Sequence, residues 1–322
     1  MFLNLKEILT PAYNQKFAVL ACNIRHPIIM AACLDAAFAV QSPIILEIAE
    51  SEQEYCAWSP EEIVPQVQLI LEQYQKLYGY TVPVGLHLDH VQKDEALIER
   101  ALQAGFRSAL LDLSRFNDEE NYRRCLLMKE KMRSYQASLE MEQGAIGFAK
   151  DLPAEDVTVE SLYTTVEKAV LAVETVQPDA LAIAVGNGHG LYKETPHIGF
   201  ARIQMIADAL HQYRTPLVLH GGSGLSLDIF AQAVAVGINK VNYATELSLI
   251  LFSHLPQDLQ IAMEEAAKIA GTEWRKMIGR YKSEIAAVEQ NSLRICHQDL
   301  KEHVIALLTK GLGSAYQAKL YQ

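Results

Sequence analysis

The chain has 322 residues, of which 50% are hydrophobic and 21% charged, a composition typical of a globular protein with a sizeable core. Its 39 acidic and 28 basic residues give a formal net charge of −11, and neither sign forms a long run. Because nucleic acids and anionic membranes bind concentrated basic surfaces, this balance argues against both as partners.

Short apolar segments alternate with longer segments of helical periodicity along most of the chain. The short segments are apolar or β-branched almost throughout, as expected for parallel strands that are covered on both faces. Between them, residues 60–71 have helical spacing, and Ser59 with Glu62 has the spacing of a capping box. The eight predicted strands are Phe17–Cys22, Pro43–Ile48, Val82–Leu88, Ser108–Leu113, Gln136–Met141, Ala180–Val185, Pro216–Leu219 and Lys240–Tyr243.

Eight strand–helix units in a chain of this length favour a (β/α)8 TIM barrel, with a doubly wound open sheet as the alternative. No Gly-, Ser- or Pro-rich linker divides the sequence, so we expect a single domain over residues 1–322. From about Leu255 onward the pattern is helical only. It predicts a C-terminal helical extension over about residues 255–322, packed on the barrel or on a partner subunit.

Histidines follow three of the predicted strands: His90, His189 and His220. The carboxyl ends of barrel strands meet at one end of the barrel, where active sites lie. Catalytic zinc usually takes three protein ligands and leaves one position open for substrate. Each histidine alone would be read as structural, but three at matching strand ends favour a metal site. His87 is interpreted as a neighbour of that site.

Carboxylates stand at the same strand ends. Asp89 is the candidate acid/base, since a carboxylate beside a cation stays ionised and can accept a proton from a substrate hydroxyl. The alternative is that Asp89 only orients a histidine. Asp112 and Glu142 are candidate alternate metal ligands or groups that orient the ligands. A second metal or a monovalent cation is left open.

A glycine-rich turn, Gly221-Gly222-Ser223-Gly224, precedes a helical segment at 225–236. Glycines let backbone N–H groups approach an anion, and a helix N-terminus favours negative charge. A Gly-Gly pair alone would indicate only a tight turn. The loops after strands seven and eight, however, form the recurrent phosphate site of barrels. With Asn242 and Thr245 at the next strand end, the sequence predicts a phosphate held beside a metal.

The five cysteines are scattered and form no CxxC pair, so neither a disulfide framework nor a zinc ribbon is expected. The segment 1–7 lacks the features of a signal peptide, and no apolar run approaches membrane-spanning length. These features predict a cytoplasmic protein that does not bind membranes.

Five ordered segments resemble the class II, zinc-dependent ketose-bisphosphate aldolases, which include the fructose- and tagatose-bisphosphate enzymes. The similarity runs from Leu5 to Ala315 and so covers essentially the whole chain. The segments are Leu86-His87-Leu88-Asp89-His90, Leu139-Glu140-Met141-Glu142, Val185-Gly186-Asn187-Gly188-His189-Gly190-Leu191-Tyr192-Lys193, Val218-Leu219-His220-Gly221-Gly222-Ser223-Gly224 and Lys240-Val241-Asn242-Tyr243-Ala244-Thr245-Glu246-Leu247.

The resemblance implies a lyase of carbohydrate metabolism, acting in glycolysis or a related route. It would reversibly cleave a ketose 1,6-bisphosphate or ketose 1-phosphate to dihydroxyacetone phosphate and an aldehyde. It implies zinc on His90, His189 and His220, Asp89 as the acid/base, and a homodimer or homotetramer. The residues implied for the dihydroxyacetone phosphate portion are Gly190, Lys193, Gly221, Gly222, Ser223, Asn242, Tyr243, Ala244 and Thr245.

The chain departs from the family pattern in the loop after the fifth strand. Lys150 stands where the family has the glutamate that manages the proton of the enediolate, and Glu155 is the nearby candidate to replace it. Val91 stands where the family prefers a small residue or histidine.

Other departures concern the far end of the substrate. Glu47-Ile48-Ala49 replaces a Gln-x-Ser pattern, and Ser248 replaces a basic residue that helps to hold a second phosphate. We therefore expect the C1-phosphate site to be kept and the sugar tail to differ, with Arg25 as a candidate contact for an anionic tail. Two other functions stay open: a catalytically weak relative that binds metal and sugar phosphate, and a metal-dependent barrel hydrolase or isomerase.

Overall fold

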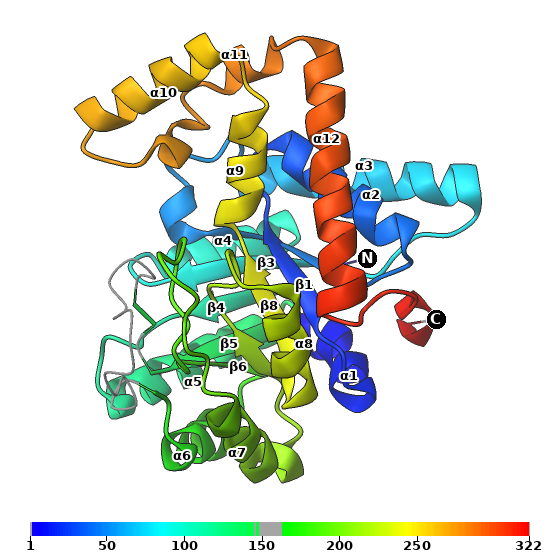
Figure 1. The fold of residues 1–322 in the computed structure, drawn as a ribbon. Helices are drawn as coiled ribbons and strands as arrows, with labels where there is room; N and C mark the ends of the chain where they lie inside the picture. The colour runs from blue at the N-terminus through cyan, green and yellow to red at the C-terminus, as the bar shows by residue number, and fades with distance from the viewer. Residues whose placement is uncertain (1, 145, 148–162, 322) are drawn as a thin grey trace.

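The computed structural model describes residues 2–144, 146–147 and 163–321. Within these ranges, eight parallel strands close into one barrel in chain order, and β8 pairs with β1 (Figure 1). This closure confirms the (β/α)8 barrel and excludes the open sheet. The strands are β1 (Val19–Asn23), β2 (Ile44–Ala49), β3 (Val84–Val91), β4 (Ser108–Leu111), β5 (Ser138–Gln143), β6 (Ala180–Ile183), β7 (Leu217–Leu219) and β8 (Ile238–Tyr243).

Helices cover the outside of the barrel and extend beyond it at the C-terminal end of the chain (Figure 1). They are α1 (Leu5–Gln15), α2 (Pro27–Ala39), α3 (Pro60–Tyr78), α4 (Ala96–Ala104), α5 (Asp118–Arg133), α6 (Val166–Val176), α7 (Phe200–Leu210), α8 (Leu227–Ala235), α9 (Thr245–Ser253), α10 (Gln257–Ile269), α11 (Lys282–Ala286) and α12 (Gln290–Ala306). Short 3-10 turns are η1 (Glu50–Glu52), η4 (His211–Tyr213), η5 (Trp274–Met277) and η7 (Ala318–Tyr321), and η6 (Leu307–Gly311) continues α12 as a π-helical turn.

Local signals set the helix starts. Pro60 is the first residue of α3, and the Glu62 carboxylate accepts a hydrogen bond from the backbone N–H of Ser59 at 2.8 Å, as the sequence predicts. Every predicted strand overlaps an observed one. The largest difference is at β3, which runs three residues past its predicted end at Leu88 to Val91 and contains a bulge within this extension.

The half of the barrel interior at the amino-terminal ends of the strands is apolar and is closed by α1. Leu5, Ile8 and Leu9 of this helix pack against side chains from the first residues of several strands, including Val19 and Ile45. This plug excludes water from the amino-terminal end of the barrel. The polar part of the interior therefore lies above it, toward the carboxyl ends of the strands.

A charged layer lies above the apolar plug. Glu47, His87, Glu140 and Lys240 come from four different strands, and each is fully buried inside the barrel. Branched aliphatic side chains usually fill these layers in TIM barrels. Ionisable side chains at this depth must pair with one another, because an isolated buried charge is strongly destabilising.

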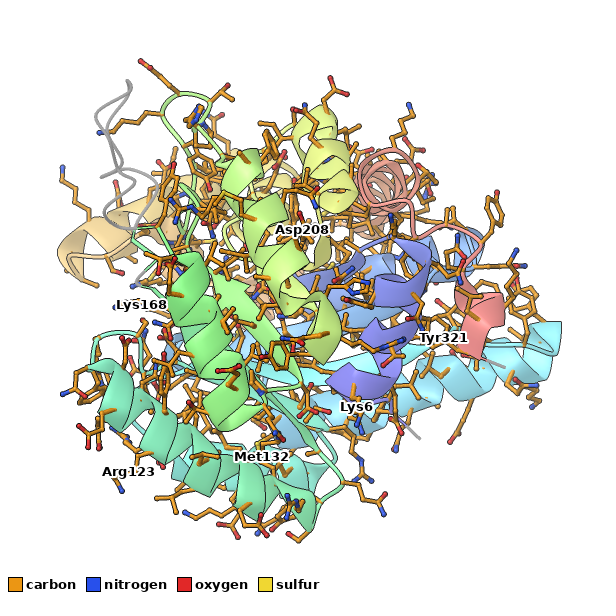
Figure 2. All side chains as sticks on the ribbon, turned by 90° about the horizontal axis from the view of Figure 1, so that it is seen from below. Lys6, Arg123, Met132, Lys168, Asp208 and Tyr321 are labelled. Carbon is orange, nitrogen blue, oxygen red and sulfur yellow. The ribbon has the colours of Figure 1, made fainter. Side chains whose placement is uncertain are left out.

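The segment after β8 forms the predicted helices, and α12 packs along α2 and α9 on the outside of the barrel (Figure 1). Beyond it the chain returns to the barrel: the hydroxyl of Tyr321 donates to the carbonyl of Ile8 in α1 at 2.6 Å (Figure 2). All five cysteines are free thiols. None of the described helices combines the length and apolar character that crossing a membrane requires.

Candidate active site at the carboxyl ends of the strands

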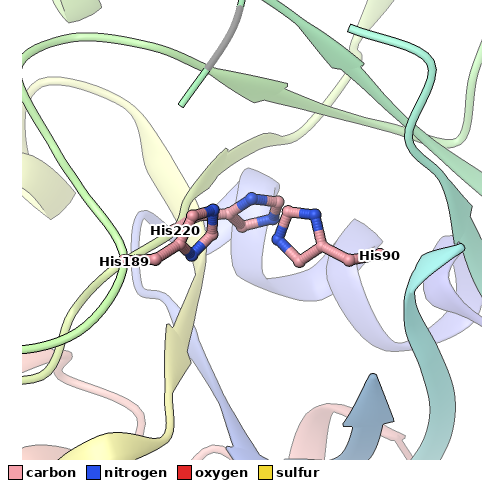
Figure 3. A group of neighbouring side chains, drawn as sticks. All are labelled: His90, His189 and His220. Atoms are coloured by element: carbon pink, nitrogen blue, oxygen red, sulfur yellow. The ribbon is translucent and has the colours of Figure 1, made fainter. Parts of the chain in front are cut away.

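The three histidines singled out in the sequence meet at the carboxyl end of the barrel. His90 lies near the end of β3, His189 in the loop after β6, and His220 directly after β7 (Figure 3). Each offers a ring nitrogen, and these three atoms lie within 4.8 Å of one another. The ring of His90 lies 4.7 Å from that of His189 and 4.6 Å from that of His220, centroid to centroid. Three convergent imidazoles are a donor set that suits zinc.

A β-bulge brings Asp89 and His90 to the same side of the barrel. Two residues of β3, Asp89 and His90, stand opposite one residue of β4 between the pairs Leu88–Ala109 and Val91–Leu111. His90 has a left-handed backbone, with φ 45°. In a regular strand, neighbouring side chains point to opposite faces. The bulge removes that alternation, so consecutive residues supply a carboxylate and an imidazole to one site.

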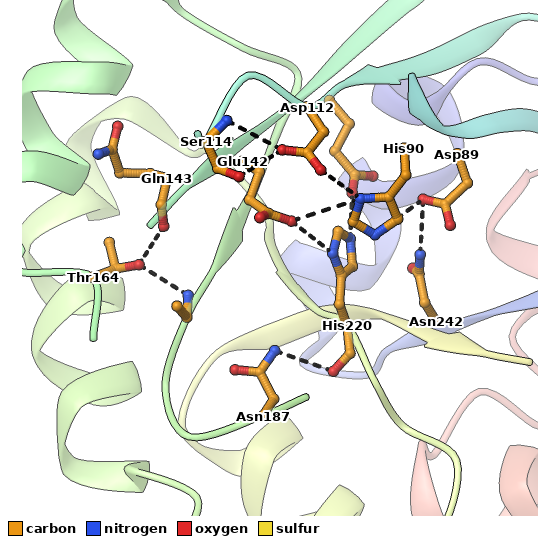
Figure 4. Close-up of polar contacts among 12 residues, drawn as sticks. Asp89, His90, Asp112, Ser114, Glu142, Gln143, Thr164, Asn187, His220 and Asn242 are labelled. Carbon is orange, nitrogen blue, oxygen red and sulfur yellow. Dashed lines mark hydrogen bonds and ion pairs between the residues drawn. The ribbon is translucent and has the colours of Figure 1, made fainter. Parts of the chain in front are cut away.

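Buried carboxylates orient the histidines. Asp112 Oδ2 lies 2.9 Å from His90 Nδ1, and Glu142 Oε2 lies 3.1 Å from His220 Nδ1 (Figure 4). Glu140 Oε1 lies 3.0 Å from the other ring nitrogen of His220, Nε2. The bond to Asp112 fixes the ring plane of His90, as the groups around metal-binding histidines usually do. His220 can donate to a metal only through a nitrogen that one of its two carboxylates releases, and the other carboxylate then orients the ring.

The same carboxylates make the site attractive to a cation. Burial opposes protonation, but Asp89 and the bond to Asp112 raise the pKa of His90 to about 9. Against the same opposition from burial, bonds to Glu140 and Glu142 raise the pKa of His220 to about 10. A bound metal would satisfy these carboxylates in place of the ring protons.

The Nε2 atom of His90 is a candidate ligand for such a cation. His90 Nε2 is buried and has no hydrogen-bond partner among the described residues. Burial and the charges of the other two histidines lower the pKa of His189 to about 3, so its ring is neutral and can donate a lone pair. The histidine set therefore fits a metal ion.

Asp89 is held by a chain of polar contacts that ends at Lys240. The ammonium of Lys240 donates to Asn242 Oδ1 at 2.7 Å, and Asn242 Nδ2 donates to Asp89 Oδ1 at 3.1 Å. Because an ammonium can only donate, it fixes which end of the Asn242 amide faces Asp89. Burial opposes ionisation of Asp89, but His90, His220 and Lys240 lower its pKa below the ordinary value. Asp89 is therefore an oriented carboxylate able to accept a proton.

Lys240 also reaches the histidine site through Glu140. Its Nζ lies 2.9 Å from Glu140 Oε2 and 3.5 Å from Glu47 Oε2. Glu47, His87 and Asp89 form a second group with the spacing of metal ligands. The Lys240 ammonium already supplies positive charge beside this group, which argues against a metal there.

The glycine-rich turn after β7 lies against the loop after β6. Gly221 has φ 68°, and a Cβ on it would lie 2.1 Å from the carbonyl oxygen of Gly188. Only glycine therefore fits, and the close approach brings backbone from both loops beside the histidines. The Ser223 hydroxyl accepts hydrogen bonds from the N–H groups of Ala244 at 3.1 Å and Glu246 at 3.3 Å. Its own proton stays available for a ligand.

The other residues predicted for the phosphate end are spread around this turn. Gly190 has φ 99°, Lys193 is exposed, and Thr245 is buried at the start of α9 with its hydroxyl 3.5 Å from Arg275 Nη1. The Tyr243 side chain points away from the barrel interior and contacts Glu246 and His303. Two other residues of the sequence argument, Lys150 and Glu155, lie outside the described residues.

Arg25, the candidate for an anionic tail, is engaged within the chain. It is 4% exposed, its Nε pairs with Glu52 at 2.5 Å, and its Nη1 donates to Ser248 Oγ at 3.0 Å. Asn23 and the backbone N–H of Ala49 donate to the same carboxylate of Glu52. The Arg25 charge is thus already compensated where β1 and β2 end.

Comparison with known proteins identifies the family. The model of the family "Fructose-bisphosphate aldolase class-II" matches residues 3–301. The chain belongs to the class II fructose-bisphosphate aldolase family. Aldolases of this family are carbon–carbon lyases, so the chain is an enzyme of carbohydrate metabolism whose family binds phosphorylated sugars.

Relatives within the aldolase family differ in substrate. The chain is 31% identical to the sulfofructosephosphate aldolase of Alkalicoccus urumqiensis, over 79% of this chain and 84% of that protein. It is 34% identical to the D-tagatose-1,6-bisphosphate aldolase subunit GatY of Klebsiella oxytoca, over 76% and 81%. In fold it is similar to the YdjI aldolase from Escherichia coli, with a TM-score of 0.74, 24% identity and coverage of 99% and 100%.

Proposed function

We propose that the protein is a zinc-dependent class II aldolase that reversibly cleaves a phosphorylated ketose to dihydroxyacetone phosphate and an aldehyde. The observation that carries this proposal is the convergence of His90, His189 and His220, with ligand atoms within 4.8 Å of one another, next to the buried carboxylate of Asp89. A metal beside an oriented base is what retro-aldol cleavage needs, since one group must stabilise negative charge and the other must accept a proton.

The three histidines would hold one catalytic zinc ion. When bound, zinc supplies a Lewis acid that polarises the ketose carbonyl and stabilises the negative charge left by bond cleavage. A second group of potential ligands, His90, Asp112 and Glu142, offers an alternate position for the ion or a place for a second one. Membership of the class II aldolase family, which is generally zinc-dependent, supports zinc as the metal.

Asp89 would take the proton from the hydroxyl on the carbon that becomes the aldehyde. Its lowered pKa keeps it ionised near neutral pH, and Asn242 and Lys240 keep its oxygen in a fixed direction. Returning a proton to the triose fragment needs a second acid, and we assign this role to Glu155 from the sequence, because Lys150 replaces the glutamate of the family pattern.

The phosphate of the triose portion would lie against Gly221, Gly222 and Ser223. Backbone N–H groups and the Ser223 hydroxyl can donate to its oxygens, and the start of α9 adds a favourable dipole. The other residues that we assign to this end of the substrate, from the resemblance, are Gly190, Lys193, Asn242, Tyr243, Ala244 and Thr245. Because the Tyr243 side chain points outward to Glu246 and His303, this assignment concerns its backbone.

We propose that the preferred substrate is a ketose 1-phosphate without a second phosphate. Ser248 is buried and stands where a basic residue is common, and Arg25 is neutralised by Glu52. A second phosphate would therefore meet no uncompensated charge from either residue. A relative named for sulfofructose phosphate indicates that substrate tails vary within the family.

We propose that residues 1–322 act as one domain, with the helices after about residue 255 packed on the barrel. We also propose that the protein is cytoplasmic and forms a homodimer or homotetramer.

The test is a retro-aldol assay on zinc-loaded protein, with fructose and tagatose bisphosphates compared with a series of ketose 1-phosphates. We expect chelator-sensitive release of dihydroxyacetone phosphate and the highest kcat/KM on a ketose 1-phosphate. Asp89→Asn should lower kcat by roughly 10²- to 10⁴-fold while the zinc content stays unchanged. Asp208→Asn, an exposed change on α7 (Figure 2), should leave activity unchanged.

Each alternative gives a different result. A preference for a bisphosphate would overturn the assignment of the tail but keep the aldolase. Zinc binding without release from any substrate would indicate a catalytically weak, metal- and sugar-phosphate-binding relative. Turnover without triose phosphate would indicate a hydrolase or isomerase.

A further inference from the structure

A chain of hydrogen bonds links helix α12 to the glycine-rich turn after β7. It runs from His303 on α12 through Tyr243 at the end of β8 and Glu246 in the first turn of α9 to the backbone of Gly224. The bond between Tyr243 and His303 is 2.8 Å long, and that between Gly224 N and Glu246 Oε2 is 3.0 Å long. The path thus joins Tyr243 to His303, which is 60 residues later in the sequence, and Gly224 to Glu246, which is 22 residues later.

The proton positions along this path follow from the donors and acceptors. Glu246 Oε2 accepts from both the Tyr243 hydroxyl and the Gly224 N–H. Since Tyr243 gives its only proton to Glu246, its oxygen must accept from His303, whose Nε2 therefore carries a hydrogen. Burial lowers the pKa of His303, and burial and Glu246 raise that of Tyr243, so both side chains stay neutral near pH 7.

The hydrogen-bond path from His303 contacts the glycine-rich turn at Gly224. The two preceding residues of the turn, Gly222 and Ser223, are themselves bonded to the end of β8 and the start of α9. Gly222 N donates to the carbonyl of Asn242 at 2.9 Å, and the Ser223 hydroxyl accepts from two N–H groups at the start of α9. Gly224 has φ 87°, a conformation that needs an external contact to be held in one state. The Glu246 carboxylate supplies that contact, and Tyr243 keeps this carboxylate in place.

Strand alternation explains why Tyr243 can do this. Asn242 faces Asp89 inside the barrel, so the next side chain, Tyr243, points outward between α8 and α12. There its ring is buried against Phe230, and its hydroxyl contacts Glu246, the residue that accepts from Gly224 of the turn.

We propose that Tyr243 and His303 are positioning residues that hold the Gly222–Gly224 turn in the conformation that binds the substrate phosphate. This inference rests on the proposed function, because it takes the turn as the phosphate site. Without Tyr243, the Glu246 carboxylate would be free to turn toward the N–H groups at the start of α9 and would repel a phosphate there. Helix α12 thereby contributes to substrate affinity although it supplies no residue to the reaction.

Tyr243→Phe removes the hydroxyl and keeps the ring, and His303→Phe breaks the path from the other end at a partly exposed position. The chain offers a matched control. Tyr74 donates to the carboxylate of Asp35, which lies 3.2 Å from His297 on the same helix α12. Among the residues that the structure describes, no hydrogen bond or ion pair joins this trio to the turn. Tyr74→Phe therefore removes the same kind of bond without touching the proposed phosphate site.

Phosphate affinity is measured first on metal-free protein, by titration calorimetry with inorganic phosphate. KM and kcat on the best ketose phosphate are then measured on zinc-loaded protein. We expect Tyr243→Phe and His303→Phe to weaken phosphate binding and raise KM by about tenfold, with kcat within about twofold, the effect of losing one hydrogen bond to a charged group. Tyr74→Phe should match the wild type in both measurements.

Unchanged phosphate affinity and KM in a folded Tyr243→Phe or His303→Phe protein would overturn the inference, and so would a wild-type protein that binds no phosphate. The proposed function can fail separately. If the wild type releases no triose phosphate from any ketose phosphate but both variants still lose phosphate affinity, the positioning role stands and the aldolase assignment does not.

Discussion

Lys240 is fully buried, and its ammonium contacts Asn242, Glu140 and Glu47. Glu140 is the closer of the two carboxylates to the Lys240 ammonium, so Lys240 and Glu140 form the ion pair. Burial raises the pKa of Glu47 well above its usual value and so favours its neutral form. A single positive charge deep in the barrel thus orients Asp89 through Asn242 and His220 through Glu140.

We expect Lys240→Met to destabilise the fold by about 3–5 kcal/mol, because it takes the closest ammonium away from the buried Glu140 carboxylate. Zinc affinity should also fall, since Glu140 would no longer hold the His220 ring. Urea unfolding and zinc competition with a chelator measure the two effects.

The control is Lys168→Met, which removes an exposed ion pair with Asp118 on the outside of the barrel (Figure 2). It should cost no more than about 1 kcal/mol and leave zinc affinity unchanged. Equal losses in the two variants would mean that the buried pair has no special role.

Among the helices, α1 has a distinct position because it closes the barrel instead of covering its side. Asn4 and Glu7 form a capping box at its start, which fixes the entry of the chain, and Leu9 is fully buried among residues of the strands. The helix and the lowest residues of the strands form one apolar cluster that is separate from the larger core outside the barrel.

Leu9→Ala should therefore lower the free energy of unfolding by about 2–5 kcal/mol, because a closed barrel cannot collapse into the cavity. Leu77 on α3 is 70% exposed, so Leu77→Ala should change the free energy of unfolding by less than about 1 kcal/mol. Urea denaturation of both variants decides the matter, and a similar small change in both would show that α1 is not needed to close the barrel.

At the scale of the whole molecule, His26 is one group through which stability should fall as the pH drops below about 6.5. Its Nδ1 accepts a hydrogen bond from the N–H of Ile28 at the start of α2, and burial followed by the charge of Lys282 lowers its pKa from 6.5 to about 4. Between about pH 6.5 and pH 4, His26 is therefore protonated in the unfolded chain but not in the folded chain.

We expect His26→Asn, which keeps a capping side chain that does not titrate, to gain stability relative to the wild type as pH falls through this window, by up to about 3 kcal/mol. Urea unfolding of metal-free protein at several pH values between 7 and 4 measures the difference. A pH-independent difference between His26→Asn and the wild type would contradict the assignment.

The barrel and the meeting of the histidines were predictable from sequence for one physical reason. Parallel strands have their carboxyl ends at the same end of a barrel, so residues that follow different strands come together whatever the loops do. The strand pattern alone therefore placed His90, His189 and His220 near one another. Their roles as metal ligands remain a prediction.

The side-chain partners were not predictable in the same way. Which carboxylate contacts which histidine depends on strand register, and Glu140 and His220 are 80 residues apart. The predicted eighth strand begins at Lys240, whereas β8 begins at Ile238. Alternation from Asn242 would have placed Lys240 inside the barrel, and the same rule would have turned Tyr243 outward.

The bulge in β3 has an evolutionary consequence. Two residues of β3, Asp89 and His90, face one residue of β4. His90 therefore has no partner in the regular ladder between the two strands. A one-residue insertion into an ordinary barrel strand would therefore be enough to add an imidazole beside an existing interior carboxylate. Conversely, deleting residue 90 would restore regular pairing and remove one histidine from the site. A barrel could thus have gained or lost its metal chemistry by a change that leaves its architecture intact.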